Sequence, residues 1–150
     1  MLPSYLAGDN WWPDGAKLSN METRANPLKV LLVDDEAYFR LFVGKVLRLA
    51  VECQIDEARD GAEAITYCET HDPDLIVLDI NMPRVDGVQA LGKIREMKPD
   101  TPIIMLTSIS EEVIVEECVT KGASYFIRKD VRADELQTEL QEMLKIFPQV

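Results

Sequence analysis

An apolar run that ends in a carboxylate is the feature that most constrains this chain. Leu75-Ile-Val-Leu contains only apolar side chains and leads directly into Asp79, which indicates a strand buried on both faces. Asn81, Pro83 and Gly87 then break the strand and predict a turn toward a new helix. Because ligands bind at the carboxyl ends of the strands in an open parallel α/β sheet, Asp79 is a candidate functional residue.

The same alternation of strand and helix patterns continues along the chain. Short apolar runs predict five strands, and apolar residues at helical spacing predict five helices that follow them. The expected strands cover residues 28–33, 52–58, 75–79, 102–107 and 124–129, and the expected helices cover 36–50, 60–71, 87–98, 110–122 and 132–147. This order predicts a doubly wound α/β fold with a five-stranded parallel sheet and right-handed crossovers. The expected strand order is 2-1-3-4-5, as in flavodoxin-like folds, with the polar second strand at an edge.

Local signals place several helix ends. Asp60 and Glu63 have the spacing of a capping box at the start of the second helix. Ser110 is the expected N-cap of the fourth helix, and Glu111 and Glu112 follow in the first turn, where the helix dipole favours a negative charge. Gly122 is expected to end this helix.

The predicted strand order brings distant carboxylates to one end of the sheet. Asp34 and Asp35 follow the first strand and Asp79 ends the third, and these two strands flank the switch point. Carboxylates that converge in one small cleft repel each other, so at least one should hold a proton unless a cation is present. An all-oxygen site of this kind suits Mg²⁺.

Two further strand ends add a hydroxyl and an ammonium group to these acids. Thr107 ends the fourth expected strand and Lys129 ends the fifth. Phosphoryl transfer needs a metal and a lysine to neutralise phosphate oxygens, a hydroxyl that donates a hydrogen bond, and a nucleophile. A carboxylate such as that of Asp79 can be this nucleophile and become an aspartyl phosphate.

Together, these motifs resemble those of the response-regulator receiver domains of two-component signalling, in particular the chemotaxis regulators. The resemblance covers about residues 28–148, and it rests on the Asp34-Asp35 pair, the Asp79 segment, Thr107-Ser108 and Phe126-Ile-Arg-Lys129. It implies that the chain is a signalling switch that works by binding partners. Its only catalysis would be its own phosphorylation and assistance to its own dephosphorylation.

The resemblance implies a role for each acidic residue. Asp79 would accept a phosphoryl group from a phosphohistidine of a histidine kinase or a histidine phosphotransfer protein. Mg²⁺ would be bound directly by Asp35, by Asp79 and by the backbone carbonyl of Asn81. Asp34 would contribute through a water molecule.

The resemblance also implies a conformational switch. Thr107 and Lys129 would bind the phosphate oxygens, and Phe126 matches the aromatic switch residue of the family. On phosphorylation Thr107 would move toward the phosphate and Phe126 would rotate inward, which alters the face formed by the fourth helix, the fifth strand and the fifth helix. This face would meet a downstream protein target or a second copy of the chain.

At one position the chain departs from the family pattern. Asp130 stands where a proline usually follows the lysine, and it adds a negative charge there.

The composition limits which binding partners and which cellular compartment are expected for this chain. The net charge is −11, from 16 basic and 27 acidic residues, which argues against direct nucleic-acid binding. No apolar run approaches the roughly 20 residues of a membrane helix, so no membrane partner is expected. Cys53, Cys68 and Cys118 are odd in number and form no CxxC pair, which favours a reducing cytoplasm over a disulfide framework.

The first 26 residues differ from the rest. They contain Trp11-Trp12-Pro13-Asp14-Gly15, an aromatic and turn-rich stretch without helix or strand periodicity. We interpret residues 1–26 as an accessory N-terminal tail, flexible or of artificial origin, and residues 27–150 as the receiver-like domain. The alternative is a tail that docks its two tryptophans. Because no second domain follows Val150, output by protein–protein contact is expected, unless the chain is a fragment of a longer protein.

Other interpretations of the same residues stay open at this point. Asp79 alone could cap a turn, Lys129 could be a surface lysine, and Phe126 could be a core residue. A phosphatase like the haloacid dehalogenases would need an acid where Asn81 stands, and a flavin carrier would need a phosphate-cradling loop where residues 34–36 are acidic. A pseudo-receiver that binds partners without phosphorylation is the main alternative function.

Overall fold

Five strands alternate with five helices in the computed structural model, which describes residues 27–82, 84–108 and 112–147. The strands are β1 (Leu28–Val33), β2 (Cys53–Ala58), β3 (Leu75–Asp79), β4 (Ile103–Thr107) and β5 (Tyr125–Arg128). The helices are α3 (Ala37–Ala50), α4 (Gly61–Thr70), α5 (Gly87–Met97), α6 (Glu112–Thr120) and α7 (Ala133–Ile146). Every predicted element is present, and its ends differ from the predicted ones by at most two residues.

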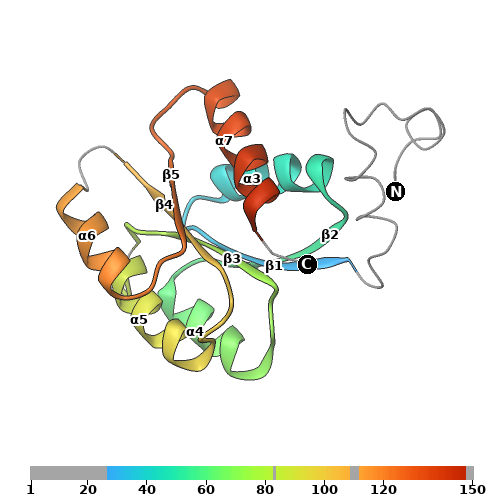
Figure 1. Cartoon of the computed structure of the whole chain (residues 1–150). Coiled ribbons are helices and arrows are strands. Elements are labelled where there is room, and N and C mark those ends of the chain that lie inside the picture. The colour runs from blue at the N-terminus through green and yellow to red at the C-terminus, as the bar shows by residue number, and fades with distance from the viewer. Residues whose placement is uncertain (1–26, 83, 109–111, 148–150) are drawn as a thin grey trace.

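The strands form one parallel sheet in the order β2-β1-β3-β4-β5 (Figure 1). This confirms the predicted fold class and strand order, and the polar strand β2 lies at an edge. β1 pairs with both β2 and β3, and its last residue, Val33, lies beside Leu78. Because the chain changes direction across the sheet between β1 and β3, the carboxyl ends of these two strands form the switch point of the fold.

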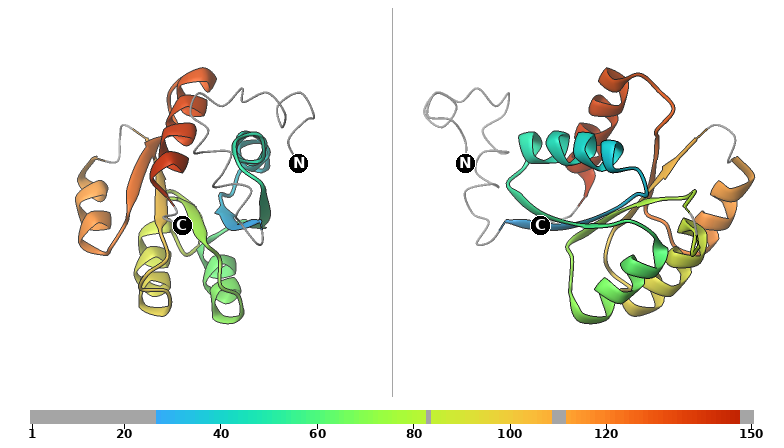
Figure 2. Two further views of the ribbon diagram at one scale, coloured as in Figure 1. Left: turned by 45° about the vertical axis from the view of Figure 1, so that its right-hand side comes forward. Right: turned by 180° about the vertical axis from the view of Figure 1, so that it is seen from behind.

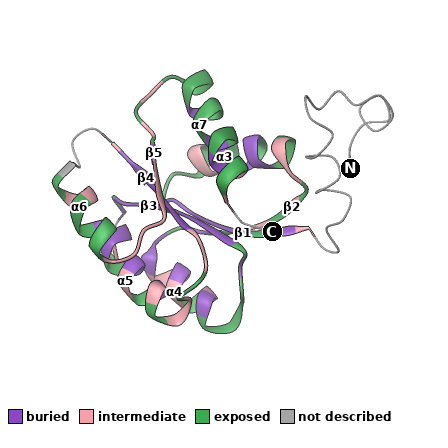
Figure 3. Cartoon of the chain, viewed as in Figure 1, coloured by how far each residue is buried: buried purple, intermediate pink, exposed green. Residues whose placement is uncertain are grey.

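Helices cover both faces of the sheet (Figures 1 and 2). Side chains of β3 alternate between the two layers: Ile76 and Leu78 pack on the side of α4, α5 and α6, and Leu75 and Val77 pack on the side of α3 and α7. Every residue of β3 and β4 is buried (Figure 3), which is why both strands read as continuous apolar runs. In the described part of the chain, no helix has the length and apolar character that crossing a membrane requires.

Two helices begin at aspartates whose side chains cap them. Asp60 caps α4 as predicted, and its carboxylate accepts a hydrogen bond from the Glu63 backbone N–H at 2.9 Å. The predicted capping box is wrong in its second half, because the Glu63 carboxylate accepts from the Arg59 backbone N–H at 2.7 Å and from its guanidinium at 2.9 Å. The ion pair with Arg59 draws this carboxylate one residue further back. α5 has a full capping box formed by Asp86 and Gln89, which the sequence analysis missed.

Some sequence predictions fall outside the described residues. Residues 1–26, with their paired tryptophans, are among them, so the N-terminal tail stays a prediction. The expected N-cap Ser110 and the acidic Glu111 also lie outside the described part of the chain. Gly122, the expected end of the fourth helix, has the left-handed φ of 99° and is the second residue after the end of α6.

Candidate functional site

Three aspartates meet at the carboxyl ends of the neighbouring strands β1 and β3. Asp34 and Asp35 follow β1, and Asp79 is the last residue of β3. Each offers one carboxylate oxygen, and these oxygens all lie within 4.8 Å of one another. Asp34 and Asp79 are buried, with 0% and 3% of their surface exposed, whereas Asp35 is exposed. The acids therefore converge as the sequence predicted, and we call these three residues the acid cluster.

Burial raises the pKa of the two buried aspartates of the acid cluster. Burial raises the pKa of Asp79 to about 7, and the charge of Asp34 adds to this rise. The ammonium of Lys129 and a hydrogen bond from the Asn81 backbone N–H oppose it. Burial also raises the pKa of Asp34, although its carboxylate accepts from Lys129 and from the Glu36 N–H at 2.9 Å. A hard cation among these oxygens removes the electrostatic penalty, so the donor set fits Mg²⁺.

We expect the metal-free protein to lose stability as the pH rises from about 4 to about 8. The folded-state pKa of Asp79, about 7, lies above the ordinary value of 3.8. The stability from its bound proton is therefore fully present below about pH 4 and is lost as the pH rises through about 7. This difference in pKa corresponds to at most about 4 kcal/mol.

Urea unfolding in the presence of a chelator, repeated from pH 4 to pH 8, measures this dependence. Asp79→Asn cannot ionise, so its stability should vary less with pH and should exceed that of the wild type at pH 8. A wild-type protein with the same pH dependence as Asp79→Asn would contradict the raised pKa.

Lys129 approaches the acid cluster from the end of β5. Its Nζ lies 2.8 Å from a carboxylate oxygen of Asp34, 3.3 Å from one of Glu36 and 3.4 Å from one of Asp79. Its backbone N–H donates to the carbonyl oxygen of Thr107 at 2.7 Å, which ties the ends of β5 and β4 together. Burial lowers the pKa of Lys129, but the hydrogen bond to Asp34 and the charges of Asp79 and Asp34 outweigh burial and raise it. Lys129 is therefore charged and offsets the buried acids.

The remaining predicted site residues come from β3, β4 and β5. Thr107 is the last residue of β4, is buried, and donates from its hydroxyl to the Ser108 carbonyl oxygen at 3.2 Å. Asn81 follows β3 and is exposed, with its backbone N–H directed to the Asp79 carboxylate. Phe126 lies within β5 and is half-buried against the hydrophobic layer beneath α4, α5 and α6. Thr107 and Asn81 thus lie at the same carboxyl-terminal end of the sheet as the acid cluster. Phe126 instead packs within the hydrophobic layer between the sheet and α4, α5 and α6.

Asp130, the residue that departs from the resembled family, is paired with Arg128. The Arg128 guanidinium donates to both carboxylate oxygens of Asp130, at 2.6 Å and 3.0 Å. These two residues flank Lys129 in the sequence, while the Lys129 ammonium reaches the acid cluster. The negative charge of Asp130, which follows Lys129 in the sequence, is thus balanced by the positive charge of Arg128, which precedes it.

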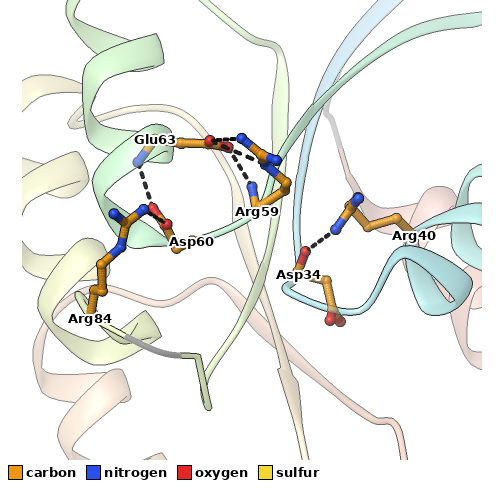
Figure 4. Close-up of polar contacts among 6 residues, drawn as sticks. All are labelled: Asp34, Arg40, Arg59, Asp60, Glu63 and Arg84. Atoms are coloured by element: carbon orange, nitrogen blue, oxygen red, sulfur yellow. Dashed lines mark hydrogen bonds and ion pairs between the residues drawn. The ribbon is translucent and has the colours of Figure 1, made fainter.

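Two arginines that no sequence pattern indicates bind the loops around the site (Figure 4). Arg40 of α3 donates to the backbone carbonyl of Asp34 at 2.6 Å and to the carboxylate of Glu57 at 2.6 Å. Arg84, in the loop between β3 and α5, has a left-handed φ of 62° and forms an ion pair with buried Asp60. The ion-pair partners are 17 and 24 residues apart in the sequence, and no local spacing indicates either contact.

Comparison with known proteins identifies the family to which this arrangement belongs. The sequence profile of the response regulator receiver domain matches residues 30–141. The chain belongs to this family. The receiver domain is 32% identical over 118 residues to the chemotaxis protein CheY of Listeria monocytogenes, which covers 79% of this chain and 99% of that protein.

Solved structures agree with the family assignment. The receiver domain resembles the chemotaxis protein CheY4 of Vibrio cholerae with a TM-score of 0.68 and 30% identity, over 78% of this chain and 98% of that chain. It also resembles a chain of the CheX–CheY–BeF₃–Mg²⁺ complex from Borrelia burgdorferi with a TM-score of 0.71 and 31% identity, over 82% of this chain and 91% of that chain. Receiver domains bind Mg²⁺ at an acidic pocket, and the acid cluster is consistent with such a site. The family assignment supports a role in phosphorylation-controlled signalling.

Proposed function

We propose that this receiver domain accepts a phosphoryl group on Asp79 from a phosphohistidine of a histidine kinase or a histidine phosphotransfer protein. The observation that carries the proposal is the convergence of the acid cluster, with the Lys129 ammonium 3.4 Å from Asp79. In the transfer, a lone pair of an Asp79 carboxylate oxygen forms the new O–P bond. The N–P bond of the donor breaks, and its electron pair returns to the imidazole nitrogen.

The chemistry of the donor set supports Mg²⁺ as the cofactor. In the proposal Asp35, Asp79 and the backbone carbonyl of Asn81 are its direct ligands, and Asp34 acts through water. Asp34 is fully buried and already accepts from Lys129 at 2.8 Å, which supports the indirect role. When bound, Mg²⁺ supplies positive charge that offsets the carboxylates and the phosphate oxygens.

Thr107, Lys129 and Phe126 are proposed to convert phosphorylation into a change of surface. Thr107 and Lys129 bind the phosphate oxygens, and Phe126 rotates inward as Thr107 moves. The new charge on Asp79 thereby biases two arrangements of the face formed by α6, β5 and α7. α6 exposes the apolar side chains of Val113 and Val119, with 84% and 58% of their surface accessible, which supports a protein-binding role for a face that includes this helix. Its partner is a downstream protein or a second copy of the chain.

The phosphodonor is proposed to dock beside α3. This helix begins two residues after Asp35, and it exposes 79% of Tyr38 and 59% of Leu41. Exposed apolar side chains next to a reactive carboxylate suit a protein donor better than a small molecule.

We propose that the domain has no enzymatic turnover beyond its own phosphorylation and dephosphorylation. We also propose that it acts in the cytoplasm, in keeping with its free cysteines.

Incubation with Mg²⁺ and a small phosphodonor such as acetyl phosphate, followed by intact mass measurement, tests the proposal. We expect the wild type to gain one phosphoryl group and Asp79→Ala to gain none. Asp100→Ala, which removes an exposed aspartate before β4, should behave as the wild type. No gain by the folded wild type would overturn the proposal in favour of a pseudo-receiver, and equal labelling of Asp79→Ala would place the phosphoryl group elsewhere.

A further inference from the structure

An aromatic ring lies against the ammonium group of the site lysine. The Nζ of Lys129 is 4.3 Å from the centroid of the Phe39 ring, within the range of a cation–π interaction. Only 15% of the Lys129 side chain is exposed, so the contact is largely shielded from water. Shielding strengthens the attraction between a cation and a ring face.

The Phe39 ring is held in place by its own surroundings. Phe39 lies in the first turn of α3 and packs against the hydrophobic layer between α3, α7 and the sheet. Its ring centroid is 6.5 Å from that of Phe42, one turn further along the helix. Glu36, which precedes α3, also contacts the Lys129 ammonium, at 3.3 Å. The start of α3 therefore presents both a carboxylate and a ring face to Lys129.

The ring differs from the Asp34 and Asp79 contacts of Lys129 in one physical respect. The attractions of Asp34 and Asp79 depend on the negative charge of their carboxylates. A divalent cation among these carboxylates offsets that charge and repels the ammonium. The attraction of a neutral ring for the ammonium does not depend on the charge of the acids, so it persists when the acid cluster is occupied.

We propose that Phe39 is a positioning residue for phosphoryl transfer, whose ring holds the Lys129 ammonium beside Asp79 while a divalent cation occupies the acid cluster. This inference rests on the proposed function of the site. Phe39 touches neither the acid cluster nor the phosphoryl group in this scheme, and it acts through Lys129. The sequence pattern accounts for Phe39 only as an inward-facing helix residue, so the test must separate the ring face from simple core packing.

The first experiment compares rates of phosphorylation by acetyl phosphate with Mg²⁺. Phe39→Leu and Phe39→Met keep an apolar side chain but remove the ring, and we expect about a fivefold lower rate, or about 1 kcal/mol. Phe39→Tyr keeps the ring and should stay within about twofold of the wild type. Leu49→Ala is the control, because it truncates a side chain that is 83% exposed near the other end of the same helix.

The second experiment observes the contact without any phosphorylation. The ring current of Phe39 should shift the ε-methylene proton resonances of Lys129 upfield in the NMR spectrum, and Lys129→Met assigns those resonances. We expect the shift with and without Mg²⁺ in the wild type and in Phe39→Tyr. We expect its loss in Phe39→Leu and Phe39→Met.

The outcomes distinguish this inference from the proposed function. A wild type that gains no phosphoryl group overturns both. A phosphorylated wild type together with an unimpaired Phe39→Leu overturns the role of Phe39 alone. Loss of the upfield shift on addition of Mg²⁺ also overturns the role of Phe39. The ring would then release Lys129 when the cation occupies the acid cluster, which is when the proposal requires the contact.

Discussion

Gly87→Ala is expected to lower the free energy of unfolding by about 3 kcal/mol or more. Gly87 is the first residue of α5, and its N–H donates to the Ile80 carbonyl oxygen at 2.8 Å. An added Cβ would overlap the carbonyl oxygen of Asp79 and would lie 2.6 Å from the Ile80 Cα. These are backbone atoms that cannot rotate away, so α5 must shift from β3. Because Asp79 is one of the displaced residues, any folded fraction should also accept the phosphoryl group more slowly.

Gly92→Ala is the matched control for this prediction. Gly92 lies inside the same helix, and the nearest atom to its added Cβ is Lys121 Cδ at 3.8 Å, an ordinary contact distance. This variant should gain up to about 1 kcal/mol, because alanine favours a helix interior more than glycine does. Urea unfolding at one pH compares the two variants. A Gly87→Ala protein within about 1 kcal/mol of the wild type would show that α5 does not begin against the backbone of β3.

Substitutions in the acid cluster and at Lys129 are expected to change Mg²⁺ affinity in opposite directions. Asp35→Asn and Asp79→Asn each remove an anionic ligand of a hard cation and should weaken Mg²⁺ binding by about tenfold or more, or about 1.4 kcal/mol. Lys129→Met should strengthen it severalfold, because it removes a positive charge that lies 2.8 Å from Asp34 and 3.4 Å from Asp79. A fall in affinity in Lys129→Met would contradict the electrostatic account of the site.

Much of the fold follows from patterns that are local in the sequence. The run from Leu75 to Asp79 is apolar because both faces of β3 are covered by helices, and this makes the strand recognisable. Once five strands alternate with five helices, the rules for parallel connections leave few possible strand orders. The order 2-1-3-4-5 then determines that Asp34 and Asp79 are neighbours, although they are far apart in the chain.

The contacts that the sequence analysis missed depend on side-chain reach and on special backbone geometry. Arg84 adopts a left-handed φ that is unusual for a residue with a Cβ, and its pairing with Asp60 joins two loops. Arg40 reaches from a helix to a strand-end carbonyl, and neither partner carries a recognisable motif. The ring of Phe39 meets Lys129 because the long lysine side chain reaches from the end of β5 to the start of α3. Helical periodicity predicts only that Phe39 faces inward.

The departure at Asp130 shows the same difference between sequence and structure. In the sequence it is an extra negative charge next to Lys129, and its effect on that side chain has no predictable sign. In the structure the guanidinium of Arg128 pairs with both of its carboxylate oxygens. The geometry of an exposed ion pair across one residue is not encoded in a pattern that sequence analysis can recognise.

Calorimetric titration of the protein with Mg²⁺ tests the central claim most directly, which is that the acid cluster shares one cation. The series comprises the wild type, Asp35→Asn, Asp79→Asn and the control Glu139→Gln, which changes an exposed acid on α7. The account predicts one site in the wild type and in Glu139→Gln, and binding weakened by about tenfold or more in the two aspartate variants. A wild type that binds no Mg²⁺, or aspartate variants that bind it as tightly as the wild type, would contradict the claim.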